Sequence, residues 1–223
     1  MNAKQLAAEA AVALIKDGMK VGLGTGSTAY FAIQKIGSRI REEGLNLTCI
    51  ATSIQSEDLA KSLNIPMAGF DALSRLDITI DGADEADHEL QLIKGGGGAL
   101  LREKIIAYMT DHYVIIADDS KYVENLGAFF LPVEVVPFGW QRTFDHLKAL
   151  GCTPHLREKE GKTFITDNGN YILDCDFKKI TDPRTLQTQL NLIPGVVECG
   201  LFVDKAQTLI IAAADGKITT YNK

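Results

Sequence analysis

Two glycine-rich segments of the sequence each precede a helix-like pattern. The first is GLGTGST at residues 22–28, followed by helical periodicity over residues 28–43. Glycines let the backbone approach an anion closely, and the N–H groups at a helix start point towards it. The second is KGGGGALLREK at residues 94–104, in which Lys94 precedes four glycines. A nest of glycine N–H groups beside a lysine suits a developing oxyanion, so we expect an anion site at each segment.

Other ligands for these segments were weighed on the same residues. The dinucleotide fingerprint GxGxxG needs a glycine where Ser27 stands, and an acid after the next strand, which ends in Ala51-Thr52-Ser53. A turn without any ligand is a second alternative. A Walker loop would place its lysine after the glycines, whereas Lys94 stands before them. A small phosphate group is therefore the favoured interpretation of the first segment.

The segment DGADEAD at residues 81–87 has four carboxylates in seven positions and follows an apolar strand pattern. Gly82 permits a sharp bend there, so Asp81 and Asp84 are expected to face one pocket. A solvated acidic turn is the alternative without a function, and clustered carboxylates also suit Mg²⁺. The phosphate-binding groups predicted here are lysines, hydroxyls and N–H groups, which need no metal, so magnesium is disfavoured.

Three further side chains are candidates on local grounds. Glu103 lies about one turn into the helix after the second glycine segment, where it suits a general base as well as a partner of the helix dipole. Lys121 follows a strand end, and Lys4 lies on the first helix; both are surface lysines or phosphate partners. The four histidines show no metal-ligand spacing and are expected to be structural or exposed.

The composition limits the class of protein. The chain has 223 residues, 46% of them hydrophobic, and a net charge of −6, which fits a folded globular protein and excludes a disordered one. The acidic balance disfavours a nucleic-acid partner. No apolar run is long enough to span a bilayer, so no membrane partner is expected. The four cysteines form no CxxC pair and are expected to be buried, reduced thiols of a cytoplasmic protein.

The first two thirds of the chain alternate strands and helices, which predicts a parallel sheet covered by helices on both faces. We expect strands at residues 19–23, 47–51, 76–80 and 113–117, and helices at residues 4–16, 28–43, 55–63 and 99–109. Ligands bind outside the carboxyl ends of such strands. The polar segments at residues 24–28, 53–55, 81–84 and 118–121 all follow strands. They are therefore expected to converge on one rim.

The pattern changes near Leu131, where a small α+β unit is expected to begin. Its predicted strands span residues 133–136, 163–166, 171–175 and 196–203, and its predicted helices span residues 140–150 and 182–190. The turn DNGN at residues 167–170 is expected to join the strands at 163–166 and 171–175 as a hairpin. A last strand at residues 209–213 is expected to return to the main sheet.

The motifs GLGTGSTA, DGADE, KGGGGALLREKI and IADDSK occur in this order, and with them the chain resembles the type A ribose-5-phosphate isomerase family. The segments PVEVVPFGW, TDNGNYILD and IPGVVECGLF extend the resemblance over nearly the whole length. It implies interconversion of ribose 5-phosphate and ribulose 5-phosphate through an enediolate, in the non-oxidative pentose phosphate pathway. It also implies no metal or organic cofactor, and a homodimer or homotetramer.

The resemblance further implies a fold and a set of roles. A Rossmann-like catalytic domain would comprise residues 1–130 and 205–223, and a ferredoxin-like lid or oligomerisation domain residues 131–204. Glu103 would be the general base, Asp81 with Asp84 would handle hydroxyl protons and ring opening, and Lys94 would stabilise the enediolate. The implied substrate contacts are Lys4, Thr25, Gly26, Ser27, Thr28, Asp81, Gly82, Ala83, Asp84, Lys94, Gly95, Gly96, Gly97 and Lys121.

Two other function classes were weighed. A sugar-phosphate sensor domain of a transcription regulator would carry an N-terminal helix-turn-helix, and the first strand is expected too early to leave room for one. A related enzyme, either an amino-sugar phosphate deaminase or a coenzyme A transferase, is not excluded by single residues.

Overall fold

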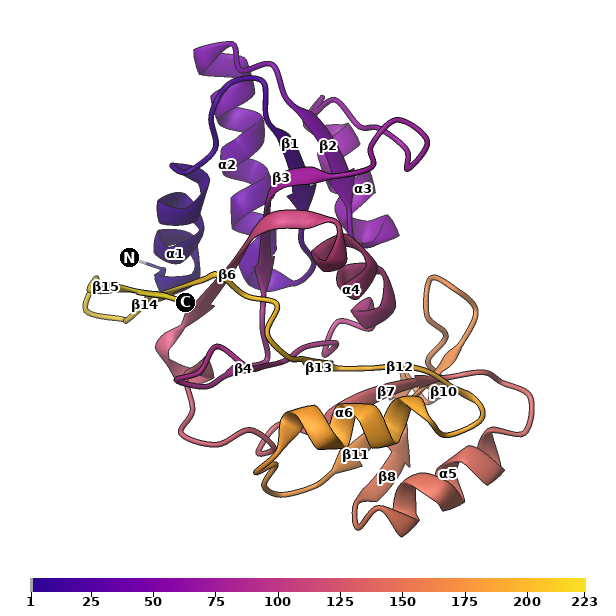
Figure 1. The fold of residues 1–223 in the computed structure, drawn as a ribbon. Coiled ribbons are helices and arrows are strands. Elements are labelled where there is room, and N and C mark those ends of the chain that lie inside the picture. Colours follow the sequence, from indigo (N-terminus) through magenta and orange to yellow (C-terminus); the bar gives the residue numbers. More distant parts are fainter. Residues whose placement is uncertain (1) are drawn as a thin grey trace. The chain divides into compact units, whose positions relative to one another are not determined.

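The computed structural model describes residues 2–223 (Figure 1). The chain folds into two compact units. Unit 1 comprises the chain up to Ala83 together with Arg102–Tyr122 and Asp204–Lys223; unit 2 comprises Asp84–Leu101 and Val123–Val203. Residues 84–101 and 123–130 thus group with unit 2, although the sequence placed them in the larger domain. The Glu85 carboxylate helps to explain this grouping, because it accepts the N–H groups of Gly127 and Phe129 at 2.7 and 2.6 Å.

A six-stranded sheet with the order β15-β14-β6-β3-β1-β2 forms the centre of unit 1. All neighbours are parallel except the edge strand β15, which runs antiparallel to β14. The strands are β1 (Lys20–Leu23), β2 (Thr48–Ala51), β3 (Leu76–Gly82), β6 (Thr110–Asp118), β14 (Thr208–Ala212) and β15 (Ile218–Asn222). The expected α/β sheet is confirmed, with one antiparallel strand added at its edge.

The helices of unit 1 cover both faces of this sheet. They are α1 (Ala3–Val12), α2 (Ser27–Glu43), α3 (Ile54–Ser62) and α4 (Leu100–Tyr108, in unit 1 from Arg102 onwards), with a short 3₁₀ turn η1 (Asp119–Lys121) after β6. Cys49 of β2 packs in the core cluster that includes residues of α1, α2 and α3. Its neighbour Ile50 packs with Ile106 of α4 in a second cluster. Successive residues of a strand point to opposite faces, so α4 lies opposite the other three helices.

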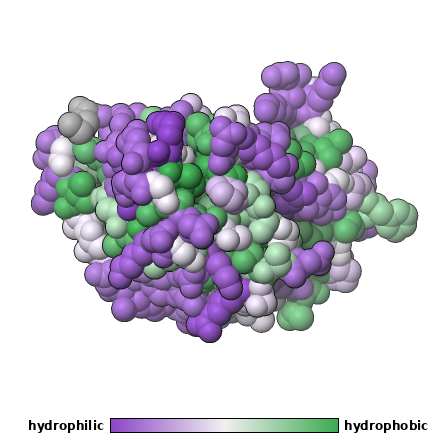
Figure 2. All heavy atoms as spheres, turned by 90° about the horizontal axis from the view of Figure 1, so that it is seen from above, coloured by the Kyte–Doolittle hydropathy of each residue, from purple (hydrophilic) through white to green (hydrophobic). Residues whose placement is uncertain are grey.

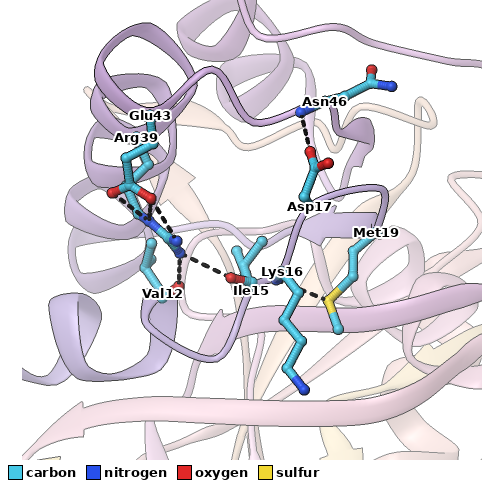
Figure 3. Close-up of polar contacts among 8 residues, drawn as sticks. All are labelled: Val12, Ile15, Lys16, Asp17, Met19, Arg39, Glu43 and Asn46. Atoms are coloured by element: carbon cyan, nitrogen blue, oxygen red, sulfur yellow. Dashed lines mark hydrogen bonds and ion pairs between the residues drawn. The ribbon is translucent and has the colours of Figure 1, made fainter.

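Polar contacts fasten the end of α1 to α2 (Figure 3). The Arg39 guanidinium donates to the carbonyls of Val12 and Ile15 at 2.8 and 3.0 Å, which gives partners to carbonyls at the helix end. Glu43, one turn further along α2, holds the guanidinium from the other side and raises its pKa. The N–H of Asn46 donates to Asp17 in the turn that follows α1. These contacts fix α1, which carries Lys4, against α2.

The order of the strands creates a switch point beside β1. From β1 the chain crosses to β2 on one side, and its next strand in the sheet, β3, lies on the other side of β1. In open parallel sheets the crevice at such a point, outside the carboxyl ends of the strands, is where ligands bind. The first glycine segment continues from the end of β1, and Asp81 lies at the carboxyl end of β3.

Unit 2 has the β-α-β-β-α-β order of a ferredoxin-like fold. Its four-stranded sheet has the order β12-β7-β11-β8, and all three pairings are antiparallel. The elements are β7 (Leu131–Val135), α5 (Trp140–Ala149), β8 (Thr153–Leu156), β11 (Tyr171–Asp176), α6 (Pro183–Asn191) and β12 (Val196–Cys199). Asp182 caps α6 by accepting the Thr185 N–H, with Pro183 in the first turn as expected.

Smaller strands complete unit 2. Its three-stranded sheet has the order β13-β5-β4, and a two-stranded ribbon joins β9 and β10. These strands are β4 (Glu85–Ala86), β5 (Leu92–Ile93), β9 (Glu158–Lys159), β10 (Lys162–Thr163) and β13 (Leu201–Phe202). The strand expected at residues 196–203 is thus broken at Gly200, whose N–H donates to the Pro132 carbonyl.

The hairpin expected from residues 163–166 and 171–175 is wrong. Strand β11 pairs with β7 and β8 instead, and of the first segment only Thr163 lies in a strand, β10. The Thr166 hydroxyl accepts the N–H groups of Asn168 and Asn170 and donates to the buried Glu134 carboxylate. Together with the backbone bonds from the Thr166 N–H to the Asn170 carbonyl and from the Gly169 N–H to the Thr166 carbonyl, these contacts hold a local turn and not a pair of strands.

The outer surface agrees with the composition. Hydrophilic residues cover much of the face drawn in Figure 2, with hydrophobic residues in smaller groups among them. Among residues 2–223, no helix has the length and apolar character needed to cross a membrane. All four cysteines are buried and none forms a disulfide, as the sequence predicted.

Candidate functional site

The first glycine segment forms the turn between β1 and α2. Gly26 precedes the first helical residue with a φ of 102°, a conformation that favours glycine over residues with a side chain. The following N–H groups belong to the start of a 17-residue helix, where the positive end of the helix dipole lies. The Lys4 ammonium donates to the Ser27 hydroxyl at 2.9 Å. A lysine, a hydroxyl and a helix N-terminus therefore meet here, which suits a phosphate group.

A cluster of side-chain hydroxyl groups forms hydrogen bonds with this turn. The Thr25 hydroxyl lies 2.6 Å from that of Thr52, 2.8 Å from that of Ser53 and 3.3 Å from that of Ser56. The Ser56 hydroxyl also donates to the Gly24 carbonyl at 2.7 Å. The cluster thereby ties the end of β1 to the end of β2 and the start of α3.

A cavity of about 210 Å³ opens beside this turn in unit 1. Its lining comes from the first glycine segment, α2 and the first turns of α3: Gly26, Tyr30, Ile33, Gln55, Ser56 and Leu59. Of the predicted substrate contacts, only Gly26 lines it, and Gln55 comes from the polar segment 53–55 expected at the rim.

Asp81 is the buried next-to-last residue of strand β3, and both of its carboxylate oxygens accept hydrogen bonds. Its Oδ1 accepts the N–H groups of Thr25 at 3.0 Å and Gly82 at 2.8 Å, and its Oδ2 accepts the Tyr113 hydroxyl at 2.9 Å. A Cβ at Gly24 would lie 2.3 Å from Oδ1, so only glycine at that position lets the two strands approach this closely. The first glycine segment and Asp81 are therefore in direct contact at the switch point.

Glu103 lies in the first turn of α4 with 4% of its surface exposed. Tyr113, a fully buried residue of β6, experiences the charges of both Glu103 and Asp81. Burial first, and then the negative charges of Asp81 and Glu103, raise the pKa of Tyr113 well above its ordinary value. Both carboxylates therefore lie near the Tyr113 phenol, on the face of the sheet that α4 covers. The phenol keeps its proton and can donate it only as a hydrogen bond.

Unit 2 contains residues 94–101 of the second glycine segment, with all four of its glycines, and the residues that shape them. Lys94 is 2% exposed, its N–H donates to the Gly200 carbonyl at 2.8 Å, and its ammonium lies 5.4 Å from the centre of the Phe202 ring. Asp84 accepts the Gly96 N–H at 2.7 Å. A buried lysine and a hydrogen-bonded glycine turn are thus placed together, which suits the stabilisation of an oxyanion.

The predicted site residues divide between the two units. Unit 1 contains Lys4, Thr25, Gly26, Ser27, Thr28, Asp81, Gly82, Ala83, Glu103 and Lys121, and unit 2 contains Asp84, Lys94, Gly95, Gly96 and Gly97. Within unit 1, hydrogen bonds join Asp81 to Thr25 and Lys4 to Ser27. Lys121 is half-buried in η1, directly after β6, the strand that neighbours β3.

Comparisons with known proteins add a family to this geometry. The model of the family described as ribose 5-phosphate isomerase A (phosphoriboisomerase A) matches residues 48–216. The chain is 52% identical to ribose-5-phosphate isomerase A of Bacillus mycoides over 97% of this chain and 98% of the relative. It is 50% identical to that of Streptococcus agalactiae serotype III over 96% of each. The chain belongs to the ribose 5-phosphate isomerase A family.

Solved structures of the family agree with this fold. Ribose 5-phosphate isomerase A of Methanocaldococcus jannaschii has a TM-score of 0.94 at 42% identity, covering 99% of this chain and 98% of that one. A D-ribose-5-phosphate isomerase in complex with phospho-erythronic acid has a TM-score of 0.96 at 37% identity, with full coverage of both chains. The resemblance recognised in the sequence motifs is confirmed.

Several residues of this family member's candidate site were not found from its sequence. Tyr113 stands in the apolar strand DHYVIIAD and reads there as an ordinary core aromatic residue. Thr52 precedes Ser53, which was expected at the rim, and Ser56 follows it by three residues. No local motif marks the contacts of Thr52 and Ser56 with Thr25. Their partners are distant in sequence and adjacent only because β3 pairs with β6 and β1 pairs with β2.

The side chains that could bind a metal ion are dispersed in the described part of the chain. Across residues 2–223 the structure has no group of three or more His, Cys, Asp or Glu side chains arranged to hold a metal ion. The carboxylates of the DGADEAD segment instead accept protein N–H and O–H groups. Asp81, Asp84 and Glu85 do so from different partners.

Proposed function

We propose that this protein interconverts D-ribose 5-phosphate and D-ribulose 5-phosphate, an aldose–ketose isomerisation of the non-oxidative pentose phosphate pathway. The names of the relatives, which align over almost the whole chain, support this activity. The structural observation that carries it is the pair of buried carboxylates, Asp81 and Glu103, near the Tyr113 phenol. Asp81 also accepts a hydrogen bond from Thr25 of the first glycine segment. Such a pair supplies a base and an acid near a bound sugar phosphate.

Glu103 is the general base of the proposed reaction. It takes the proton from C2 of the open-chain aldose, which leaves an enediolate, and returns a proton to C1, which gives the ketose. A positioned base of this kind contributes on the order of 10² to 10⁴ in rate. Its burial in the first turn of α4 keeps bulk water from competing for the proton.

Asp81 handles the hydroxyl protons of the sugar and its ring opening, with Asp84 as its neighbour in the sequence. Three donors fix the Asp81 carboxylate, so its orientation does not depend on the substrate. Lys94 with Gly95, Gly96 and Gly97 stabilises the negative oxygen of the enediolate. One well-placed donor commonly contributes about 3–4 kcal/mol to such a step.

The phosphate group is held by the first glycine segment and by lysines. Its contacts in this proposal are Thr25, Gly26, Ser27, Thr28, Lys4 and Lys121, and Gly82 with Ala83 lines the sugar. The dianion gains most from the N–H groups at the start of α2 and from the Lys4 ammonium beside Ser27.

We also propose that the protein is a cytoplasmic homodimer or homotetramer without a nucleic-acid or membrane partner. Residues 131–204 are the segment proposed for a lid or for self-association. Within it, Phe138 is 94% exposed and Leu192 is 77% exposed, which is unusual for large apolar side chains unless another surface covers them. Sedimentation equilibrium of the protein and of Phe138→Ser would test this, and a monomeric wild-type protein would contradict it.

The activity is tested by incubating the purified protein with ribose 5-phosphate in D₂O. We expect ketose to form, with deuterium at C1, because the enediolate is reprotonated there. Deuterium at C1 would support the enediolate, and no ketose at all would contradict the isomerase. Two parallel assays address the alternatives: ammonia release from an amino-sugar phosphate, and sequence-specific DNA binding at physiological salt.

A further inference from the structure

Arg157 of unit 2 donates hydrogen bonds to two backbone carbonyl oxygens of the second glycine segment. The residue lies between β8 and β9, and its side chain is 13% exposed. Its Nη1 donates to the carbonyl of Gly95 at 2.8 Å and to that of Gly96 at 3.2 Å. None of these contacts follows from the glycine motif itself, and Arg157 stands in the charged run LREKEGK, which reads as an exposed loop.

The guanidinium is itself held in place from two sides. Asp174 of β11 accepts Nε at 2.9 Å and Nη2 with its other oxygen, which is the bidentate geometry of a strong ion pair. The Phe164 ring lies 5.8 Å from the guanidinium carbon. The backbone of Arg157 is fixed as well, because its N–H donates to Ile172 and its carbonyl accepts from Phe164, both at 2.9 Å. Arg157 is therefore a rigid point of attachment.

The hydrogen bonds from Arg157 determine where the glycine N–H groups point. The structure has no cis peptide bond among its described residues, and in a trans peptide the carbonyl and the following N–H point in opposite directions. The peptide between Gly95 and Gly96 is clamped at both ends, its carbonyl by Arg157 and its N–H by Asp84. In the next peptide, Arg157 holds the Gly96 carbonyl, so the Gly97 N–H points away from the guanidinium.

A run of glycines needs such a clamp. Glycine loses more backbone freedom on ordering than any other residue, so four in a row do not hold one conformation by themselves. Gly98 adds a second restraint, because its φ is +84° and a Cβ there would lie 2.4 Å from the Phe164 ring. Phe164 thus touches both the glycine turn and the arginine that orients it.

We propose that Arg157 is a positioning residue of the isomerase reaction, which fixes the Gly97 N–H as a donor to the enediolate oxygen. The inference rests on the proposed function, because it assigns the second glycine segment to the enediolate. The guanidinium also balances the carbonyl end of the Gly96–Gly97 peptide, so the positive N–H end of that peptide faces the oxyanion. Arg157 itself does not touch the substrate, and Asp174 acts through it.

The test compares Arg157→Lys, which keeps the charge but loses the planar fork, with Arg142→Lys as the matched control. Arg142 lies on α5, is 81% exposed and pairs with Asp145. We expect kcat of Arg157→Lys to fall 10- to 100-fold while KM changes less than threefold. Phospho-erythronic acid, whose carboxylate mimics the charged enediolate, should bind more weakly by a similar factor. Arg142→Lys should match the wild type in both.

Two further variants separate positioning from folding. Asp174→Asn leaves Arg157 in place but loosens its fork, and we expect a smaller fall in kcat than in Arg157→Lys. Arg157→Ala should recover part of its kcat when guanidinium ion is added at concentrations that leave the wild type unchanged. A lower melting temperature with wild-type kcat and analogue affinity would overturn the inference. An inactive wild-type protein would instead overturn the proposed function.

Discussion

Tyr113 connects the two carboxylates to which the proposed chemistry assigns opposite roles. Its hydroxyl donates to Asp81, while its burial and the nearby charges of Asp81 and Glu103 keep it protonated. A protonated phenol can donate to the Asp81 carboxylate without adding a further negative charge near Glu103. The phenol therefore orients Asp81 and leaves its other oxygen to the backbone of Thr25 and Gly82.

Replacing Glu103 by Gln tests the general base. The amide keeps the size of the side chain but cannot accept a proton from carbon, so we expect kcat to fall by about 10² to 10⁴ with phospho-erythronic acid still bound. Kinetics and calorimetric titration of the analogue measure both effects. Glu57→Gln is the matched control, because Glu57 also lies in the first turn of a nine-residue helix. Equal losses in both variants would point to the helix dipole instead of catalysis.

Replacing Tyr113 by Phe tests the link to Asp81. Loss of the donor leaves a buried carboxylate oxygen short of a partner, which costs about 1–3 kcal/mol of unfolding free energy, and kcat should fall as Asp81 loses its orientation. Chemical denaturation at neutral pH and steady-state kinetics measure the two effects. Tyr108→Phe removes a hydroxyl from a 65% exposed ring and controls for loss of the group alone.

The same variant carries a prediction at alkaline pH. In the unfolded chain Tyr113 loses its proton near its ordinary pKa of 10, whereas the folded protein keeps it, because the folded pKa is raised. The unfolded state then binds fewer protons, so stability falls as pH rises above 10, by at most about 1.4 kcal/mol per pH unit. We expect Tyr113→Phe to lose less stability than the wild type between pH 9.5 and 11, measured by urea unfolding. Equal slopes would contradict the raised pKa.

Some site residues could be predicted from the sequence and others could not, for a physical reason. Asp81 and Lys94 stand in glycine-rich or acidic segments, whose composition is unusual outside a functional turn. Tyr113 and Arg157 stand in segments typical of a buried strand and an exposed loop. Their roles come from partners 32 and 62 residues away, and local composition contains no information about such contacts.

At the scale of elements, the approach of β1 to β3 depends on Gly24. An alanine Cβ there would lie 2.3 Å from Asp81 Oδ1 and 2.5 Å from its Cα, and the backbone cannot yield as a side chain would. We expect Gly24→Ala to lower the unfolding free energy by about 1–3 kcal/mol and to reduce kcat sharply. Gly69→Ala is the control, because nothing lies within 4 Å of its Cβ. Thermal unfolding and kinetics would compare them, and a stable, active Gly24→Ala would contradict the packing.

Elements with one dominant local signal were predictable. The helices predicted at residues 28–43, from their periodicity, and at residues 182–190, with Pro183 in the first turn, have bounds that differ from the structure by one residue. The segment 163–166 failed because Thr166 satisfies the backbone of the turn with its own hydroxyl. The edge strand β15 was missed because its burial alternates between exposed and half-buried positions and lacks a continuous apolar run.

At the scale of the whole molecule, the two units are not continuous in sequence. The change of pattern near Leu131 is visible in the sequence, but the grouping of residues 84–101 with unit 2 is not. It depends on pairings such as β5 with β13, whose partners are more than 100 residues apart. A pattern read along the chain finds where a type of structure begins, and it does not find which distant segments share a core.

The protein as a whole is expected to work without a metal ion. A divalent cation would need several oxygen ligands, yet the Asp81 oxygens accept Thr25, Gly82 and Tyr113 donors, and an Asp84 oxygen accepts Gly96. A cation at either carboxylate would have to displace these bonds. We expect protein dialysed against EDTA to isomerise ribose 5-phosphate at the untreated rate, within about twofold, in assays that contain EDTA. Activity that is lost on chelation and restored by one equivalent of Mg²⁺ or Mn²⁺ would contradict this, and would assign the acidic segment to a cation instead of to proton transfer.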